Sequence, residues 1–262
     1  NESDRTDFPY RLLLQAYNKA VNRSRDWKYG LAYYRQTSKN AEDFSELYEI
    51  FYDTRYSSTG ILEWDIQEGR YAMKTEKAVE DYVFNKNFTL LSRLVTMYQP
   101  DTDKFLMPVN ENVRDYYNLY ISELLDFEGR KVAVVNFAPK EDIYIPAMSG
   151  RLYIDIDSHD ILKLEGQIRN DHLDIIALTN PKGSWKDYVL NIDAAYKISE
   201  DKIFLDYISM SQSFDYYVEQ QPVRSVETNS FLMFTDWIHF DGLLNCYAML
   251  WNSVLVLRAV LL

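Results

Sequence analysis

The middle of the chain, residues 129–168, alternates between apolar and polar side chains with a period of two. In residues 151–157, leucine and isoleucine occupy every second position, with arginine, tyrosine and aspartate between them. Such alternation is typical of a strand that buries one face. Residues 158–160 form a turn signal, after which the apolar positions resume over residues 161–168, and residues 131–137 are a β-branched run. The pattern predicts a meander of three antiparallel strands.

Two segments have a helical period instead. In residues 8–25, apolar side chains recur every three or four positions and form one stripe, and Pro9 favours a helix start there. Residues 1–7 are polar and are expected to be frayed. Residues 87–98 repeat the spacing over a wider apolar arc, and Pro100 marks the end of that helix. Each stripe predicts that its helix packs on another element.

Strand patterns fill most of the remaining chain. They do not alternate with helices as in βαβ units, which argues against a parallel, doubly wound sheet. With no break in composition, residues 1–262 are predicted to form a single α+β domain, with a mostly antiparallel sheet of about ten strands and two helices. The further predicted strands are residues 29–38, 44–56, 61–74, 114–127, 186–198, 203–214 and 225–240.

Composition narrows the class of protein. Hydrophobic residues make up 47% of the chain, enough for a large core, so its body is expected to be folded. The net charge of −12 repels phosphate backbones and argues against nucleic-acid binding. The single cysteine, Cys246, excludes an internal disulfide but leaves the compartment open. The chain begins at Asn1 without methionine, as a form would from which a targeting segment has been removed.

The C-terminal residues 243–262 are strongly apolar over twenty positions, which leaves two interpretations. A transmembrane helix is one of them. Asn252, Ser253 and Arg258 lie inside the segment, and no basic flank follows it. We therefore expect a buried segment, with contact to a membrane or a partner protein as the alternative.

No established catalytic motif occurs in the chain. The G-x-S-x-G elbow of serine hydrolases and the glycine-rich phosphate loops are both missing. Cys246 lies in an apolar run, where a buried inert thiol is expected. Paired carboxylates such as Glu46 and Glu49, or Glu63 and Asp65, carry little information among 40 acidic residues. We predict no catalytic residue and no cofactor.

The sequence also gives little evidence for a metal site. No H-E-x-x-H motif or close histidine pair occurs, so a zinc site is not predicted. Asp155, Asp157 and Asp160 form D-x-D-x-x-D, which has a superficial similarity to a calcium loop. An EF-hand loop requires a glycine at its sixth position and a glutamate at its twelfth, where this chain has Asp160 and Gly166. We expect carboxylates that flank a turn. The three histidines are His159, His172 and His239.

Tyrosines are concentrated in the predicted early and middle strands. They could line a ligand cavity, with apolar rings and hydroxyl groups that orient a guest. Cross-strand packing on a wide sheet is the alternative, and the two are compatible. The tyrosines concerned are Tyr33, Tyr34, Tyr48, Tyr52, Tyr116, Tyr117 and Tyr120.

Several stretches resemble an uncharacterised Bacteroidetes envelope family whose domain is found downstream of carboxypeptidase-regulatory-like domains. The stretches are GRKVAVVNFAPK, SGRLYIDIDSHDILKLE, AYYRQT, DFSELYEIFYD, SFLMFTDW and MLWNSVLVLR. That family is similar in architecture to bacterial lipoprotein carriers, in which helices fill the concave side of a curved antiparallel half-barrel. The resemblance implies this fold, an envelope location (the periplasm or the outer membrane), and no activity.

Together these observations predict a half-barrel with two helices on its concave face. The predicted function is a non-enzymatic envelope module that binds an apolar ligand or a lipoprotein acyl chain, with peripheral membrane contact. The alternatives are an adaptor with a filled core that binds another envelope protein through a face or edge strand, and a hydrolase with an unrecognised carboxylate site. The predicted ligand-binding residues are Tyr17, Tyr33, Tyr48, Phe88, Leu91 and Tyr117.

Overall fold

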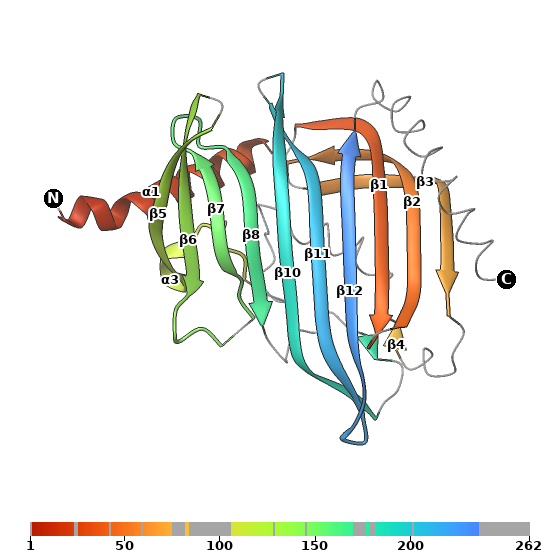
Figure 1. Ribbon diagram of the computed structural model, residues 1–262. Helices are drawn as coiled ribbons and strands as arrows, with labels where there is room; N and C mark the ends of the chain where they lie inside the picture. The colour runs from red at the N-terminus through yellow and green to blue at the C-terminus, as the bar shows by residue number, and fades with distance from the viewer. Residues whose placement is uncertain are drawn as a thin grey trace.

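Ten strands form one open antiparallel sheet in the order β3-β2-β1-β12-β11-β10-β8-β7-β6-β5 (Figure 1). The strands are β1 (Trp27–Asn40), β2 (Asp43–Ser57), β3 (Gly60–Met73), β5 (Tyr117–Phe127), β6 (Arg130–Pro139), β7 (Ser149–Asp155), β8 (Ile161–Arg169), β10 (Gly183–Ser199), β11 (Lys202–Val218) and β12 (Gln221–Thr235). The computed structural model describes residues 2–23, 26–41, 43–58, 60–74, 82–83, 106–127, 129–144, 146–169, 177–178, 182–200 and 202–235.

The predicted meander is confirmed. Strands β6, β7 and β8 are consecutive neighbours with antiparallel register. Leu152 and Ile154, which alternate with polar residues in β7, are fully buried. The prediction of a strand over residues 114–127 is wrong at its start, because a short helix, α3 (Val113–Tyr116), precedes β5. Val113 anchors that turn in the core, where its side chain is fully buried.

Helix α1 (Glu2–Arg23) confirms the first predicted helix but begins earlier than expected, so the prediction of a frayed start is wrong. It lies behind the β5–β8 half of the sheet in the view of Figure 1. Leu12, Leu13 and Ala16 are buried against the sheet, as its apolar stripe predicts. The second predicted helix, residues 87–98, lies outside the described residues, as do residues 236–240 of the last predicted strand and the C-terminal segment 243–262.

Polar contacts fix α1 to the edge strand and to the β7–β8 turn. The Tyr10 hydroxyl donates to the Tyr117 carbonyl (3.0 Å) and accepts from the Leu119 N–H (3.3 Å). At the other end of the helix, Lys19 and Arg23 both reach the buried Asp160 carboxylate, with N–O distances of 2.7 and 3.2 Å. We call the face that carries α1 and the hydrophobic core the inner face, and the opposite face the outer face.

The sheet curves toward the inner face at the β2–β3 hairpin. In Figure 1 the upper parts of β2 and β3 turn behind the central strands. The ring of Tyr56, near the end of β2, stacks on Phe234 of β12 (4.4 Å between centroids) and meets Phe204 of β11 edge-on (6.1 Å). Through these contacts the end of β2 covers part of the inner face of β11 and β12. This curvature agrees with a half-barrel. The remaining strands, β4 (Tyr82–Val83) and β9 (Ala177–Leu178), form a separate antiparallel pair.

Candidate functional site

The inner face of edge strand β3 exposes apolar side chains. Tyr71 is paired with Tyr48 and Ile66 with Tyr52, and both β2 tyrosines pack in or against the core, so their β3 partners face inward as well. Ile66 is 67% exposed and Tyr71 51% exposed. Edge strands normally present few exposed apolar groups, so this set is a candidate contact surface. We call Trp64, Ile66, Tyr71 and Met73 the inner rim.

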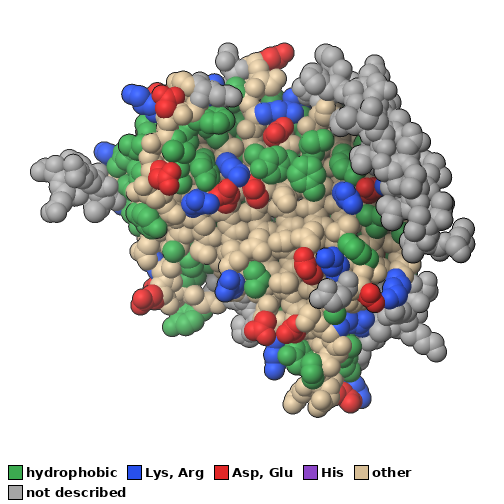
Figure 2. All heavy atoms as spheres, viewed as in Figure 1, with side chains coloured by type: hydrophobic (Ala, Val, Ile, Leu, Met, Phe, Trp, Pro, Cys, Tyr) green, Lys and Arg blue, Asp and Glu red, His purple; other side chains and the backbone are tan. Residues whose placement is uncertain are grey.

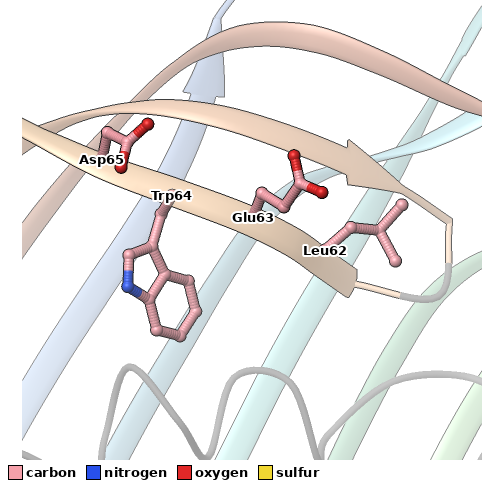
Figure 3. A pocket seen from close by; sticks show the side chains of 4 residues that line it. All are labelled: Leu62, Glu63, Trp64 and Asp65. Atoms are coloured by element: carbon pink, nitrogen blue, oxygen red, sulfur yellow. The ribbon is translucent and has the colours of Figure 1, made fainter.

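A hollow of about 400 Å³ adjoins the start of the inner rim, lined by Leu62, Glu63, Trp64 and Asp65. Figure 3 shows the Trp64 indole projecting from one side of β3 and the carboxylates of Glu63 and Asp65 from the other. The indole lies against the core and 6.3 Å from the ring of Tyr52. Trp64 thus supplies the apolar wall of the hollow.

Further along the rim, Tyr48 and Tyr71 form an aromatic pair, with centroids 4.5 Å apart. Both hydroxyls donate to Oε1 of Glu46, at 2.7 and 3.1 Å. Burial and the adjacent Glu46 carboxylate raise the pKa of the Tyr48 hydroxyl, so it stays protonated and remains a donor at neutral pH. The shared carboxylate joins the hydroxyl ends of the two rings.

The tyrosines that were predicted to bind a ligand do not lie together in the structure. Tyr48 belongs to the site described above, and Tyr17 is half-buried on α1 against the core. Tyr117 is fully buried, and its hydroxyl donates to the Leu106 carbonyl (2.9 Å), so in this structure it lies within the packed core. Burial also raises the pKa of Tyr117.

Tyr33 lies on the outer face, because its neighbours Ala32 and Tyr34 point into the core. Its hydroxyl donates to the Glu49 carboxylate (3.0 Å), so it does not line the inner face. The remaining two predicted residues, Phe88 and Leu91, lie outside the described residues. Sequence reasoning missed the inner rim. The alternation of Trp64 and Ile66 predicts a strand with one apolar face, but the register shifts between β2 and β3 decide which side of the sheet that face lies on.

The outer face carries paired charges. Figure 2 shows acidic and basic side chains across the middle of this face, with apolar groups between them. Glu165 pairs with Arg151 and Lys163 at 2.6 Å each. Burial works against the charged form of Lys163, but the Glu165 and Asp193 carboxylates outweigh it and raise its pKa. A lysine held protonated in this way is unsuited to act as a base.

The D-x-D-x-x-D turn is bound by the protein's own cations. The Asp155 carboxylate accepts from Arg130 (3.1 Å) and from the Asp157 and Ser158 N–H groups (3.0 Å each). Asp160 is engaged by α1, as described above. Within the described ranges, no group of three histidine, cysteine, aspartate or glutamate residues is placed to hold a metal ion.

Asp155 makes stability depend on pH. Burial favours its neutral form, but the two backbone N–H groups and Arg130 outweigh burial and lower the pKa of the carboxyl group. The stabilisation is present above the ordinary carboxyl pKa and is lost as pH falls through the lowered one. Asp155→Asn is expected to lower the free energy of unfolding by about 1–2 kcal/mol at pH 7, and by less at pH 3. Urea unfolding at both pH values checks this, with the exposed Asp157→Asn as control. Equal deficits at both would contradict it.

Comparisons with known proteins give distant similarities of fold. No protein-family model matches the chain, and no curated protein matches it significantly. A DUF1329 family protein from Desulfovibrio piger is 6% identical, with 88% of this chain and 92% of that chain covered and a TM-score of 0.34. A domain described as an outer membrane lipoprotein-sorting protein, from Vibrio parahaemolyticus, is 16% identical (88% and 97% covered, TM-score 0.28). MucB of Pseudomonas aeruginosa in complex with MucA is 9% identical (85% and 94%, 0.24).

At these values the similarities assign no family to the chain. The resemblance to a Bacteroidetes envelope family therefore stays a prediction, as does the single domain over residues 1–262. Among the described helices, none is long and apolar enough to cross a membrane.

Proposed function

We propose that the chain is a non-enzymatic binding module of the cell envelope that holds an apolar ligand against the inner face of its sheet. The exposed inner rim carries the proposal. It presents large apolar groups toward the concave side of an open sheet, where the fold would otherwise lose stability by leaving them in water. Pockets for small apolar molecules are typically concave and lined by aromatic groups with few polar ones, and the rim has that composition.

The geometry supports non-covalent binding of a ligand against apolar surface rather than a chemical reaction with it. The hollow beside Trp64 is open to solvent, and its lining combines Leu62 and Trp64 with the acidic residues Glu63 and Asp65. The Tyr48–Tyr71 pair offers flat aromatic surface, and its hydroxyls are engaged with Glu46. An envelope location, in the periplasm or at the outer membrane, follows from the sequence resemblance and belongs to the same proposal.

Titration of the purified chain with N-phenyl-1-naphthylamine, a fluorescent apolar probe, tests the proposal. We expect saturable binding at about one site per chain, and displacement of the probe by long-chain acyl compounds. Native mass spectrometry after incubation with lipid vesicles then identifies what the chain retains. No saturable probe binding and no retained lipid would contradict the proposal.

The second candidate function is binding of a partner protein. The observation that favours it is the exposed edge strand at the other end of the sheet. Strand β5 ends the strand order, and apolar groups there are exposed on both faces. Such an edge can receive an extended segment of another protein by strand addition. Leu124→Lys is expected to weaken such a complex without affecting ligand binding, which a pull-down from envelope extract measures. The exposed residues are Tyr120, Leu124, Leu125 and Phe127.

A further inference from the structure

The edge of β5 is occupied at its start and open further along. β5 ends the strand order of the large sheet, so one side of it has no neighbouring strand among the described residues. On that side the Tyr10 hydroxyl donates to the Tyr117 carbonyl and accepts from the Leu119 N–H. Tyr10 therefore takes the place of a neighbouring strand as far as Leu119. The part of the edge that can receive another strand begins at Tyr120.

A β-bulge interrupts this open part of the edge. The register between β5 and β6 shifts between Ile121 and Glu123, so Ser122 is the extra residue. Because the alternation reverses there, Leu124 is the next residue after Ile121 whose backbone groups point away from β6. Two residues separate these positions instead of one. A regular strand presents every second residue to the same side, so it cannot pair with both.

A second copy of β5, running in the opposite direction, has the same irregular spacing. With a two-fold axis between Ser122 and Glu123, Ile121 of each copy lies opposite Leu124 of the other. Both residues face the inner side of the sheet, because both pair with core residues of β6. The two residues of each pair then exchange both of their backbone hydrogen bonds. The bulge that rejects a regular strand is therefore self-complementary.

The exposed side chains of β5 meet apolar partners in this arrangement. On the outer face, Tyr120 lies opposite Leu125 of the second copy, and Phe127 lies diagonal to that copy's Tyr120. On the inner face, Leu124 lies opposite Ile121. Such cross-strand pairs of aromatic and aliphatic groups stabilise a sheet. The four exposed residues are 61%, 68%, 39% and 57% accessible, in the order Tyr120, Leu124, Leu125 and Phe127.

Charge weakens this contact without preventing it. Asp126 lies opposite Leu119 and Glu123 opposite Ser122, so no two acidic residues are direct partners. The two Glu123 residues flank the axis, with roughly 6 Å between their Cα atoms from the strand spacing and the rise per residue. Each copy also carries a net charge of −12. Added salt is therefore expected to strengthen the contact.

Helix α1 leaves room for the second copy. Its first turns extend past β5 on the inner face (Figure 1). The helix crosses the edge at Tyr117 and Leu119, and α1 of the second copy crosses at the opposite end of the contact. At about 3.4 Å per residue, with four to five residues on each side of the axis, the two helices lie roughly 30 Å apart.

We propose that two copies of the chain associate through β5 and join their sheets into one continuous antiparallel sheet, with both inner faces on the same side. This inference rests on the second candidate function, for which it names the partner, and does not depend on ligand binding at the inner face. The contact is short, so a dissociation constant in the micromolar range is expected.

Sedimentation velocity over the micromolar range tests the association. Leu124→Lys is expected to weaken the dimer about a hundredfold, because two lysines would be desolvated opposite Ile121. Ile66→Lys is the matched control: Ile66 is 67% exposed on the other edge strand, β3, so dimerisation is expected to be unchanged. Glu123→Gln is expected to strengthen the dimer severalfold, because it removes the repulsion at the axis. A chain that stays monomeric, or a dimer that Leu124→Lys leaves intact, would overturn the proposal.

Disulfide cross-linking in a Cys246→Ser background tests the register and does not use Leu124. Tyr120→Cys mixed with Leu125→Cys is expected to cross-link on oxidation with copper phenanthroline, because opposite residues of this kind have Cα atoms about 4.5 Å apart. Tyr120→Cys mixed with Phe127→Cys is two residues out of register and is expected to cross-link far less. Equal cross-linking of the two mixtures would overturn the pairing.

Binding of N-phenyl-1-naphthylamine by the same variants separates this proposal from ligand binding. Probe binding by a chain that stays monomeric would reject the dimer and retain the ligand-binding function. A dimer that binds no probe would do the reverse. A monomeric chain that captures a different envelope protein through β5 would retain the second candidate function and reject a second copy as its partner.

Discussion

Gly150→Ala is expected to lower the free energy of unfolding by about 3 kcal/mol or more. A Cβ atom at Gly150 would lie 2.0 Å from the Glu165 carbonyl oxygen and 2.6 Å from the Gly166 Cα. Both atoms belong to the backbone of β8, so relief requires β7 and β8 to separate in the middle of the sheet. Gly150 and Gly166 are register partners, which explains why both positions lack a side chain.

Gly166→Ala is the informative comparison. Its Cβ would meet the side chain of Met148, with 2.4 Å to the sulfur, and that flexible side chain can move. We therefore expect a smaller loss of about 1–2 kcal/mol. Urea unfolding of both variants checks the order. A Gly150→Ala protein as stable as Gly166→Ala would show that the two strands are not held this closely.

Met73→Asp is expected to weaken the binding of methyl palmitate, a long-chain acyl compound, about a hundredfold, because a carboxylate beside an apolar ligand would have to be desolvated. Met73 is 43% exposed, and its partner in β2 is Glu46. The substitution therefore changes the rim rather than the core, and the fold is expected to persist.

Val223→Asp is the matched control. Val223 is 46% exposed, at the start of β12 rather than on the rim, so it has the same exposure in a different place. Probe displacement by methyl palmitate measures both variants. Equal affinities for Met73→Asp and Val223→Asp would mean that the inner rim is not the mouth of the site.

Alternation of side chains identified strands far better than it identified which side chains meet a ligand. The meander was predictable because Leu152 and Ile154 alternate with polar residues. Only one set of side chains in that strand is therefore suited to face the core. Tyr33 and Tyr34 are adjacent and chemically identical, so only the packing of Tyr34 in the core reveals that Tyr33 faces outward. Because Tyr34 faces the core, Gln36, two residues further along the strand, also lies on the inner face. The sequence alone did not indicate a polar residue there.

The inner rim could not be predicted because irregular pairing decides which β3 side chains face inward. The register between β2 and β3 shifts twice, at Phe51/Tyr52 and at Arg55/Tyr56. Each shift inserts one unpaired residue and reverses the alternation that follows. Tyr117 illustrates the same limit. Its position in a strand was predicted, but its burial against Phe137, a ring 5.9 Å away, depends on the neighbouring strand.

The most direct test of ligand binding at the inner face is a methyl NMR titration of the chain labelled with ¹³C at its methionine methyl groups. Met73 and Met210 lie on the inner face, and Met233 lies on the outer face beside Tyr33 and Tyr207. Met→Leu variants assign the three signals. Addition of methyl palmitate is expected to shift Met73 and Met210 and to leave Met233 unchanged. A shift at Met233 with Met73 and Met210 unchanged would contradict binding at the inner face.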